Sequence, residues 1–232
     1  MKIPRSPPFL FRDLMFMLEV IAANIPAFLR FSVSPLFPNG LDELIAAIVY
    51  FIFWYFEFIN QAFVTIRNRH SIVQIKNDKL SLLGIYLGYF AMSYIAGWVA
   101  TLRLTTHFGA LPVWSFWVGV GVMLVGEGLR EWSYYTLGRF FTAPVMIAKD
   151  HKLVIRGPYK FVRHPGYLAG VLTFAGLGLA LQSWAAPIVI VIVLLITYYY
   201  RIHVEEQALR KKFGKAYDDY AKKTATIIPY VL

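Results

Sequence analysis

The sequence predicts an all-α, polytopic integral membrane protein, and three observations support this fold class. Hydrophobic residues make up 58% of the 232 residues, and the mean hydropathy is +0.56, whereas soluble domains are closer to half apolar. The apolar residues form runs close to the roughly 20 residues that a helix needs to cross the hydrocarbon core. Basic residues, which give a formal net charge of +10, lie between these runs. We therefore expect one membrane-embedded domain.

Six apolar runs are candidate transmembrane helices: 12–31, 42–65, 80–101, 111–131, 166–183 and 185–201. The first could instead be a kinked or interfacial helix, because it contains Glu19 and Pro26. The last two are joined by a short connection at 182–184, and Pro187 suits the first turn of the helix that follows. We therefore predict a helical hairpin at the end of the membrane region.

The segments outside these runs are predicted to lie at the membrane surface. The stretch 132–163 is too polar to cross and contains glycine and proline, so we expect it to be irregular. The tail 202–223 has the apolar spacing of an amphipathic helix. Basic residues are abundant in 66–79, in 130–163 and in the tail, which places these segments and both termini in the cytoplasm.

Charge and cysteine content exclude several classes of function. The basic residues alternate with membrane runs, a pattern that favours contact with anionic membrane lipids and argues against a nucleic-acid partner. The chain contains no cysteine, which excludes disulfides, thiolate chemistry and cysteine-bound zinc. We expect no metal site.

A first polar cluster, within "GPYKFVRHPGYLAG", lies where the hairpin enters the membrane. Pro165 keeps His164 out of helical geometry and suits a helix start. The free N–H groups at that helix end favour an anion, and Arg163 adds donors there. Gly166 and Gly170 leave room for a backbone or a ligand. Alternatively, Arg163 snorkels to lipid headgroups, the proline only starts a helix, and the glycines pack helices.

A second polar cluster, "RIHVEE", lies where the hairpin leaves the membrane. Arg201 and Glu205 are one helical turn apart and share a face. They could form a surface ion pair worth only about 0.3–0.5 kcal/mol. Ionisable groups at this depth, however, usually have a partner or a function.

The predicted hairpin brings the two clusters together, because residues 166 and 201 are the two cytoplasmic ends of one antiparallel pair. The combined site contains cations, carboxylates and a helix N-terminus. Such a mixture suits a zwitterion with an additional positive centre. S-adenosylmethionine has this character, since it carries a carboxylate, an amine and a sulfonium.

The ordered motifs of the C-terminal half resemble those of the isoprenylcysteine carboxyl methyltransferase family and, more distantly, phospholipid N-methyltransferases. The matching parts are G-P-Y followed by R-H-P-x-Y, then R-x-x-x-E-E, F-G-x-x-Y-x-x-Y and a terminal Ile-Pro, within roughly 130–232. The resemblance implies a membrane methyltransferase with a five-span core, to which the first span is added, and with no Rossmann domain. In agreement, no G-x-G-x-x-G follows a strand pattern.

This resemblance divides the chain and assigns its site. Residues 1–110 would be N-terminal transmembrane helices, and 111–232 would be the methyltransferase core, with cofactor-binding segments 130–167 and 201–223. The residues implied to bind S-adenosylmethionine are His164, Pro165, Tyr167, Glu205, Glu206, Gly157 and Tyr159. The resemblance also implies that Arg201 and Glu205 border the reaction centre. Because arginine holds a carboxylate by two parallel hydrogen bonds, Arg201 is the first candidate to bind an acceptor carboxylate and Arg163 is the second.

The predicted activity is methyl transfer to the carboxylate of a prenylcysteine-like substrate whose lipid enters from the bilayer. One alternative is a phospholipid or small-lipid methyltransferase, in which Glu205 would be a candidate base for an amine acceptor. The other alternative is a non-enzymatic transporter. The concentration of polar residues at one membrane surface argues against it, because transport sites lie near the midplane.

Overall fold

The computed structural model describes residues 111–141 and 151–228, together with seven helical positions between 84 and 98. The predicted spans 12–31 and 42–65 lie outside the described residues, and the span 80–101 is described only at those seven positions. The number of six spans and the division near residue 110 therefore stay predictions.

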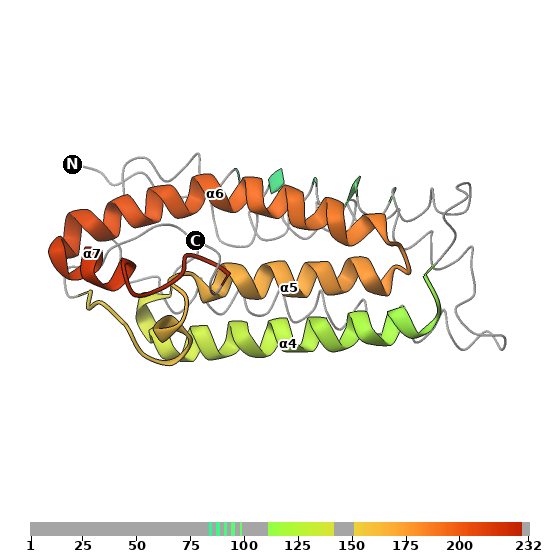
Figure 1. The fold of residues 1–232 in the computed structure, drawn as a ribbon, viewed down its shortest axis with the longest axis horizontal. Helices are drawn as coiled ribbons and strands as arrows, with labels where there is room; N and C mark the ends of the chain where they lie inside the picture. Colours follow the sequence, from blue (N-terminus) through green and yellow to red (C-terminus); the bar gives the residue numbers. More distant parts are fainter. Residues whose placement is uncertain are drawn as a thin grey trace, which may run out of the picture.

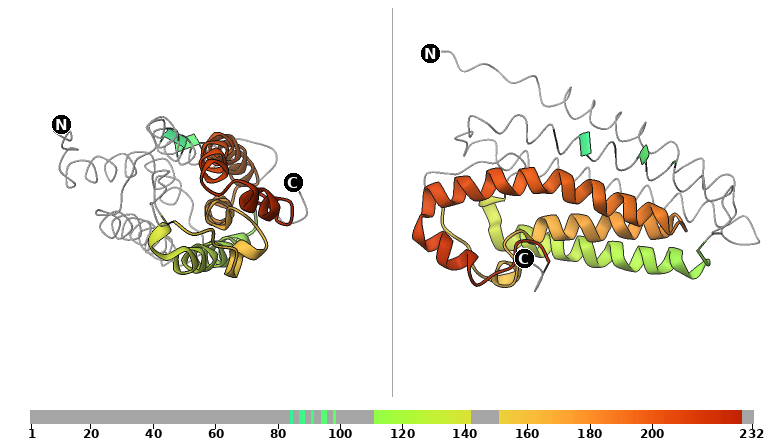
Figure 2. Two further views of the ribbon diagram at one scale, coloured as in Figure 1. Left: turned by 90° about the vertical axis from the view of Figure 1, so that its left-hand side faces the viewer. Right: turned by 45° about the horizontal axis from the view of Figure 1, so that its top comes forward.

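The described part of the chain is helical, as the sequence predicts. Its α-helices are α4 (Trp114–Leu137), α5 (Pro165–Ala180), α6 (Ala185–Phe213) and α7 (Lys215–Ala221), with short 3-10 helices at Gly138–Phe140 and Gly157–Lys160. Its β-pairing is limited to an isolated parallel bridge between Val162 and Ala225. Helices α4, α5 and α6 lie side by side along the long axis, and α7 turns back at one end (Figures 1 and 2).

The predicted hairpin is confirmed. Helices α5 and α6 are antiparallel neighbours joined by a four-residue turn. The turn contains Gln182 with a positive φ of 54°, and the hydroxyl of Ser183 accepts a hydrogen bond of 3.2 Å from the backbone N–H of Ala186. That bond satisfies a donor of the first turn of α6, which would otherwise lack a partner.

One predicted helix boundary was wrong. Helix α4 continues six residues beyond the expected end at 131, so part of the segment predicted to be irregular is helical. The predicted tail 202–223 is helical, as expected: its first part continues α6 from the predicted span end at 201 to Phe213, and a break at Gly214, which has a φ of 52°, separates α6 from α7. The reason is local, because neither stretch contains a proline or glycine until Gly138 and Gly214, respectively.

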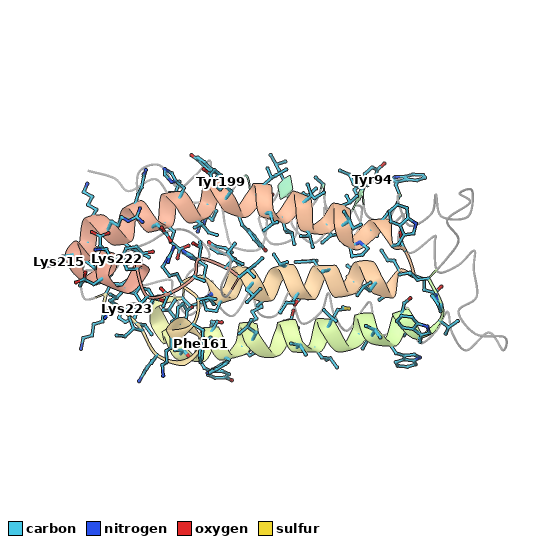
Figure 3. All side chains as sticks on the ribbon, viewed as in Figure 1. Tyr94, Phe161, Tyr199, Lys215, Lys222 and Lys223 are labelled. Atoms are coloured by element: carbon cyan, nitrogen blue, oxygen red, sulfur yellow. The ribbon has the colours of Figure 1, made fainter. Side chains whose placement is uncertain are left out.

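Helix α6 is the one helix in the described ranges that is long and apolar enough to cross a membrane, whereas α5 is apolar but has only 16 residues. The outward faces of α4 and α6 are apolar, with exposed Trp117, Leu124, Val125, Ile192, Ile196 and Tyr199. Figure 3 shows Tyr199 pointing away from the helices. Exposed side chains of this kind are typical of a surface that faces lipid.

Helices α4 and α5 pack at backbone contact distance through glycine. A Cβ added to Gly119 would lie 2.5 Å from the carbonyl oxygen of Gly176, and one added to Gly176 would lie 2.6 Å from the carbonyl oxygen of Gly119. One turn of the contact also contains a polar pair, in which the hydroxyl of Thr173 donates to Glu127 at 3.2 Å. This interface fixes the position of α5 and hence of the polar residues at its first turn.

Candidate functional site

The first turn of α5 presents the first polar cluster. His164 is the residue before the helix and has a non-helical backbone (φ −124°, ψ 61°), and Pro165 is the first helical residue. The carbonyl of His164 accepts hydrogen bonds from the N–H groups of Tyr167 and Leu168 at 3.1 and 3.2 Å. The predicted role of Pro165 as a helix start is therefore confirmed, and the side chains of His164 and Tyr167 lie one turn apart.

Helix α6 brings the second cluster into contact with the first. The hydroxyl of Tyr167 donates a hydrogen bond of 2.9 Å to Glu205 and accepts one of 3.2 Å from Nε of Arg201. Arg201 is only 2% exposed, although it carries a full positive charge. The phenol of Tyr167 thus joins a buried cation to a carboxylate, at the place where α5 and α6 meet.

His164 lies between two carboxylates. Its Nδ1 is 3.9 Å from Glu205, and its Nε2 is 3.4 Å from Glu206. The ring stacks on Tyr167 with centroids 5.5 Å apart. The side chain is buried, and Nε2 faces Glu206 across a contact that is longer and less well aligned than an ordinary hydrogen bond.

Arg163 has four hydrogen-bond contacts. Nε donates to Glu206 at 2.8 Å. One terminal nitrogen donates to the carbonyls of Ala221, at 2.8 Å, and Thr224. The other donates to the hydroxyl of Thr226 at 2.7 Å. This guanidinium therefore ties the start of α5 to the C-terminal residues and holds one oxygen of Glu206.

Glu206 is paired on both sides. Its second oxygen accepts a hydrogen bond of 3.2 Å from Arg210, one turn later in α6. Arg210 also lies 3.4 Å from Asp218 of α7 and above the ring of Tyr217, at 5.8 Å from its centroid. The charge of Glu206 is therefore offset by two arginines, and its carboxylate has a fixed orientation.

Gly157 and Tyr159 flank this cluster. Gly157 has a φ of 59°, and a Cβ there would lie 2.7 Å from the hydroxyl of Thr136 in α4. The carbonyl of Tyr159 accepts a hydrogen bond of 2.7 Å from Tyr220 of α7. Burial, reinforced by the charge of Glu205, raises the pKa of the Tyr159 phenol, and burial likewise raises the pKa of Tyr220 to about 12.

The structure brings seven of the predicted residues into one cluster: Arg163, His164, Pro165, Tyr167, Arg201, Glu205 and Glu206. Gly157 faces α4, and Tyr159 is buried and linked to α7. Their individual roles stay predictions. The i,i+4 spacing of Glu206 and Arg210 predicted an ion pair between them, and the structure contains it. Sequence reasoning missed the partners from the C-terminal residues, Thr224 and Thr226. The only available signal was the F-G-x-x-Y-x-x-Y motif, which continues the resemblance beyond the clusters.

Comparisons with known proteins agree with this geometry. The family model described as phospholipid methyltransferase matches residues 114–216. A probable protein-S-isoprenylcysteine O-methyltransferase of Oryza sativa subsp. indica is 32% identical over 50% of this chain and 61% of its own length. Protein-S-isoprenylcysteine O-methyltransferase B of Arabidopsis thaliana is 31% identical over 60% of this chain and 70% of its own length. The chain thus spans less than two thirds of the rice relative.

A structural comparison extends the likeness to nearly the whole chain. The structure of the eukaryotic intramembrane Ras methyltransferase, isoprenylcysteine carboxyl methyltransferase, matches with a TM-score of 0.58. The match covers 97% of this chain and 79% of the other, at 18% identity, and therefore concerns the fold. The helical membrane-protein fold and the clustered motifs agree with the match to the Arabidopsis relative. The chain belongs to the protein-S-isoprenylcysteine O-methyltransferase family.

Proposed function

We propose that this protein transfers a methyl group from S-adenosylmethionine to the carboxylate of a prenylcysteine-like lipid acceptor. The observation that carries the proposal is the contact of Tyr167 with both Arg201 and Glu205. It joins the two polar clusters at one end of an apolar hairpin. The relatives are named for methyl transfer to isoprenylcysteine, which supports this choice of acceptor.

The polar groups of the cluster fit the donor. The side chain of Glu205 is 32% exposed, so one carboxylate is open to an amine or to ribose hydroxyls. The ring of His164 lies between Glu205 and Glu206 and borders the same two carboxylates. When bound there, S-adenosylmethionine would supply an electrophilic methyl carbon on a positively charged sulfur. In this arrangement Glu205, Glu206 and His164 bind and orient the donor, as the family resemblance implies.

A carboxylate acceptor suits the positive charge of Arg201, which is not assigned to the donor. Such an acceptor is already anionic, so the protein needs to align it and exclude water, without a strong base. The planar guanidinium of Arg201, which is buried between α5 and α6, suits a carboxylate. Glu205 accepts a hydrogen bond of 2.9 Å from Tyr167, which holds one of its oxygens in place. The buried guanidinium of Arg201 therefore favours a carboxylate acceptor over an amine acceptor.

The position of the cluster along α6 supports entry of the acceptor from the bilayer. Arg201 lies 17 residues after Trp184, or about 25 Å along a helix. Because the exposed Trp184 marks the opposite membrane surface, the cluster lies near the inner edge of the hydrocarbon core. The helix then continues into Arg210, Lys211 and Lys212, which favours a cytoplasmic location for this end.

Calorimetry and a labelled-methyl assay on the purified full chain in detergent test the proposal. We expect binding of S-adenosylmethionine and transfer of label to N-acetyl-S-farnesylcysteine. The matched control is the methyl ester of that compound, which has the same lipid but no free carboxylate and should remain unlabelled. Absence of binding to S-adenosylmethionine would contradict the proposal as a whole.

A second candidate is a phospholipid methyltransferase, which the family model matching residues 114–216 favours. It is distinguished by adding phosphatidylethanolamine to the same assay. Label in the phospholipid, with none in the farnesylcysteine, would replace the carboxylate acceptor by an amine. In that case Glu205 would be the candidate base.

A further inference from the structure

The C-terminal residues 221–227, here called the C-terminal strap, run across the start of α5. The N–H groups of Arg163 and His164 donate to the carbonyls of Ala225 and Thr226 at 2.8 and 3.0 Å, and the N–H of Ala225 donates to Phe161 at 3.3 Å. This is a short parallel pairing between segments about 60 residues apart. The strap passes from α7 toward the centre of the hairpin (Figure 1).

The strap is held at both ends. At its start, the hydroxyl of Thr224 donates to the carbonyl of Tyr220 at 2.8 Å, which fixes the turn after α7. At its end, Ile227 packs against the buried hydrophobic core, to which α4, α5 and α6 all contribute. The strap is therefore anchored in the core at its end, and its backbone pairs with Arg163 and His164 at the start of α5.

Arg163 connects the strap to Glu206. The same guanidinium that donates to Glu206 at 2.8 Å also donates to the strap at Thr226, at 2.7 Å. It further donates to the carbonyls of Ala221 and Thr224. The planar guanidinium of arginine has N–H donors in several fixed directions and can bind these four acceptors together, whereas the three donors of a lysine ammonium are all on one nitrogen. One of the two arginines that orient Glu206 is thus itself held by the strap.

We propose that Arg163 is a positioning residue that locks the C-terminal strap over the start of α5 and so sets His164 and Glu206 for the methyl donor. This inference rests on the proposed function, since it assigns a wall of the same site. It gives Arg163 a task other than holding the acceptor. It also makes residues 221–227 part of the donor site.

Three variants at Thr226 and Arg163 separate this role from general stability. Thr226→Val keeps the shape of the side chain but removes the acceptor, and Thr226→Ser restores the hydroxyl. Arg163→Lys keeps the positive charge but removes the planar guanidinium with its separate N–H donors. The matched control is Lys223→Ala, which changes an exposed side chain of the same strap.

The first readout is hydrogen exchange of the ligand-free protein at the amides of Arg163, His164 and Ala225. We expect faster exchange at these amides in Thr226→Val and Arg163→Lys, and wild-type exchange in Thr226→Ser and Lys223→Ala. The second readout is the Kd for S-adenosylmethionine by calorimetry. Loss of one hydrogen bond to a charged group should raise it about tenfold in Thr226→Val, with Thr226→Ser close to wild type.

The outcomes are distinguishable. Unchanged amide exchange in both Thr226→Val and Arg163→Lys would overturn the proposal that Arg163 locks the C-terminal strap, whatever the methyltransferase activity of the variants. Faster exchange with an unchanged Kd shows that the strap is only structural and overturns the positioning role. If the wild-type chain does not bind S-adenosylmethionine, the proposed function itself fails and the positioning role fails with it. Because Thr226→Val preserves the volume of the side chain, the test does not depend on Arg163→Lys folding.

Discussion

Helix α5 is held in two different ways along its length. In its apolar part it contacts α4 through backbone atoms, as at Gly119 and Gly176. At its first turn it contacts α6 and the C-terminal strap through polar side chains, chiefly Arg163 and Tyr167. In lipid, helices gain little by burying apolar surface against each other, so small residues and close packing bring them together. Near the membrane surface, charged groups can pair, and hydrogen-bond geometry fixes the arrangement.

The glycine contact and the polar contacts of α5 are expected to respond differently to mutation. A change at the glycine interface should lower the free energy of unfolding, whereas a change in the polar cluster should mainly affect binding or turnover. Function is expected to depend on the polar end because its ionisable groups include the partly exposed carboxylate of Glu205. At the glycine interface, backbone atoms of the two helices are in direct contact.

The largest effect is expected for Arg201→Ala at the polar end. The substitution removes a buried cation and the hydrogen bond that it donates to the hydroxyl of Tyr167. Turnover at saturating donor should fall at least about 100-fold, or roughly 2.7 kcal/mol in activation free energy. The labelled-methyl assay measures this, with Lys211→Ala on the same helix as an exposed control. Wild-type turnover in Arg201→Ala would remove this arginine from the reaction centre.

An intermediate effect is expected for Gly119→Ala at the glycine interface. The added methyl group would lie 2.5 Å from backbone atoms of α5, which cannot move aside without separating the helices. Such overpacking typically costs about 1–3 kcal/mol of unfolding free energy. Thermal unfolding in detergent measures the loss.

The control for that experiment is Gly121→Ala on the same helix, where an added Cβ has no atom within 4 Å. It should stay within about 0.5 kcal/mol of wild type. Equal unfolding temperatures for the two variants would show that the close α4–α5 approach does not limit stability.

The smallest effect is expected for Tyr220→Phe, at the edge of the polar end. The substitution removes the hydrogen bond to the carbonyl of Tyr159, worth about 1 kcal/mol at neutral pH. Burial raises the pKa of Tyr220 to about 12, above the value near 10 of an unfolded tyrosine. Between these two pH values the folded protein retains a proton that the unfolded chain loses, so stability falls as pH rises.

Thermal unfolding between pH 8 and 11 checks this prediction. Wild type should lose stability above about pH 10, and Tyr220→Phe should show a shallower decline because it lacks one of the phenols responsible. An identical decline in the two proteins would show that Tyr220 does not contribute to the alkaline loss.

Much of the site was predictable because its signals are local. Apolar runs separated by a short turn predict a hairpin, and a hairpin places its two open ends together. The proline after His164 predicts a helix start, and the spacing of Arg201 and Glu205 predicts a shared face. These inferences need only helix geometry, and the contact between Tyr167 and Glu205 confirms that the two clusters meet.

By itself, the sequence determined that the protein is membrane-embedded, that its described part is helical, and that two polar clusters meet at one end of a hairpin. Only the tertiary structure decided which partners each polar group takes. The four hydrogen bonds of Arg163 reach residues 43, 58, 61 and 63 positions away. The physical reason is that periodicity and turn chemistry act over a few residues. Contacts across 40 to 60 residues depend on how the helices pack, and here α5 and α6 approach closely at Gly178, where an added Cβ would lie 2.6 Å from the backbone nitrogen of Pro187.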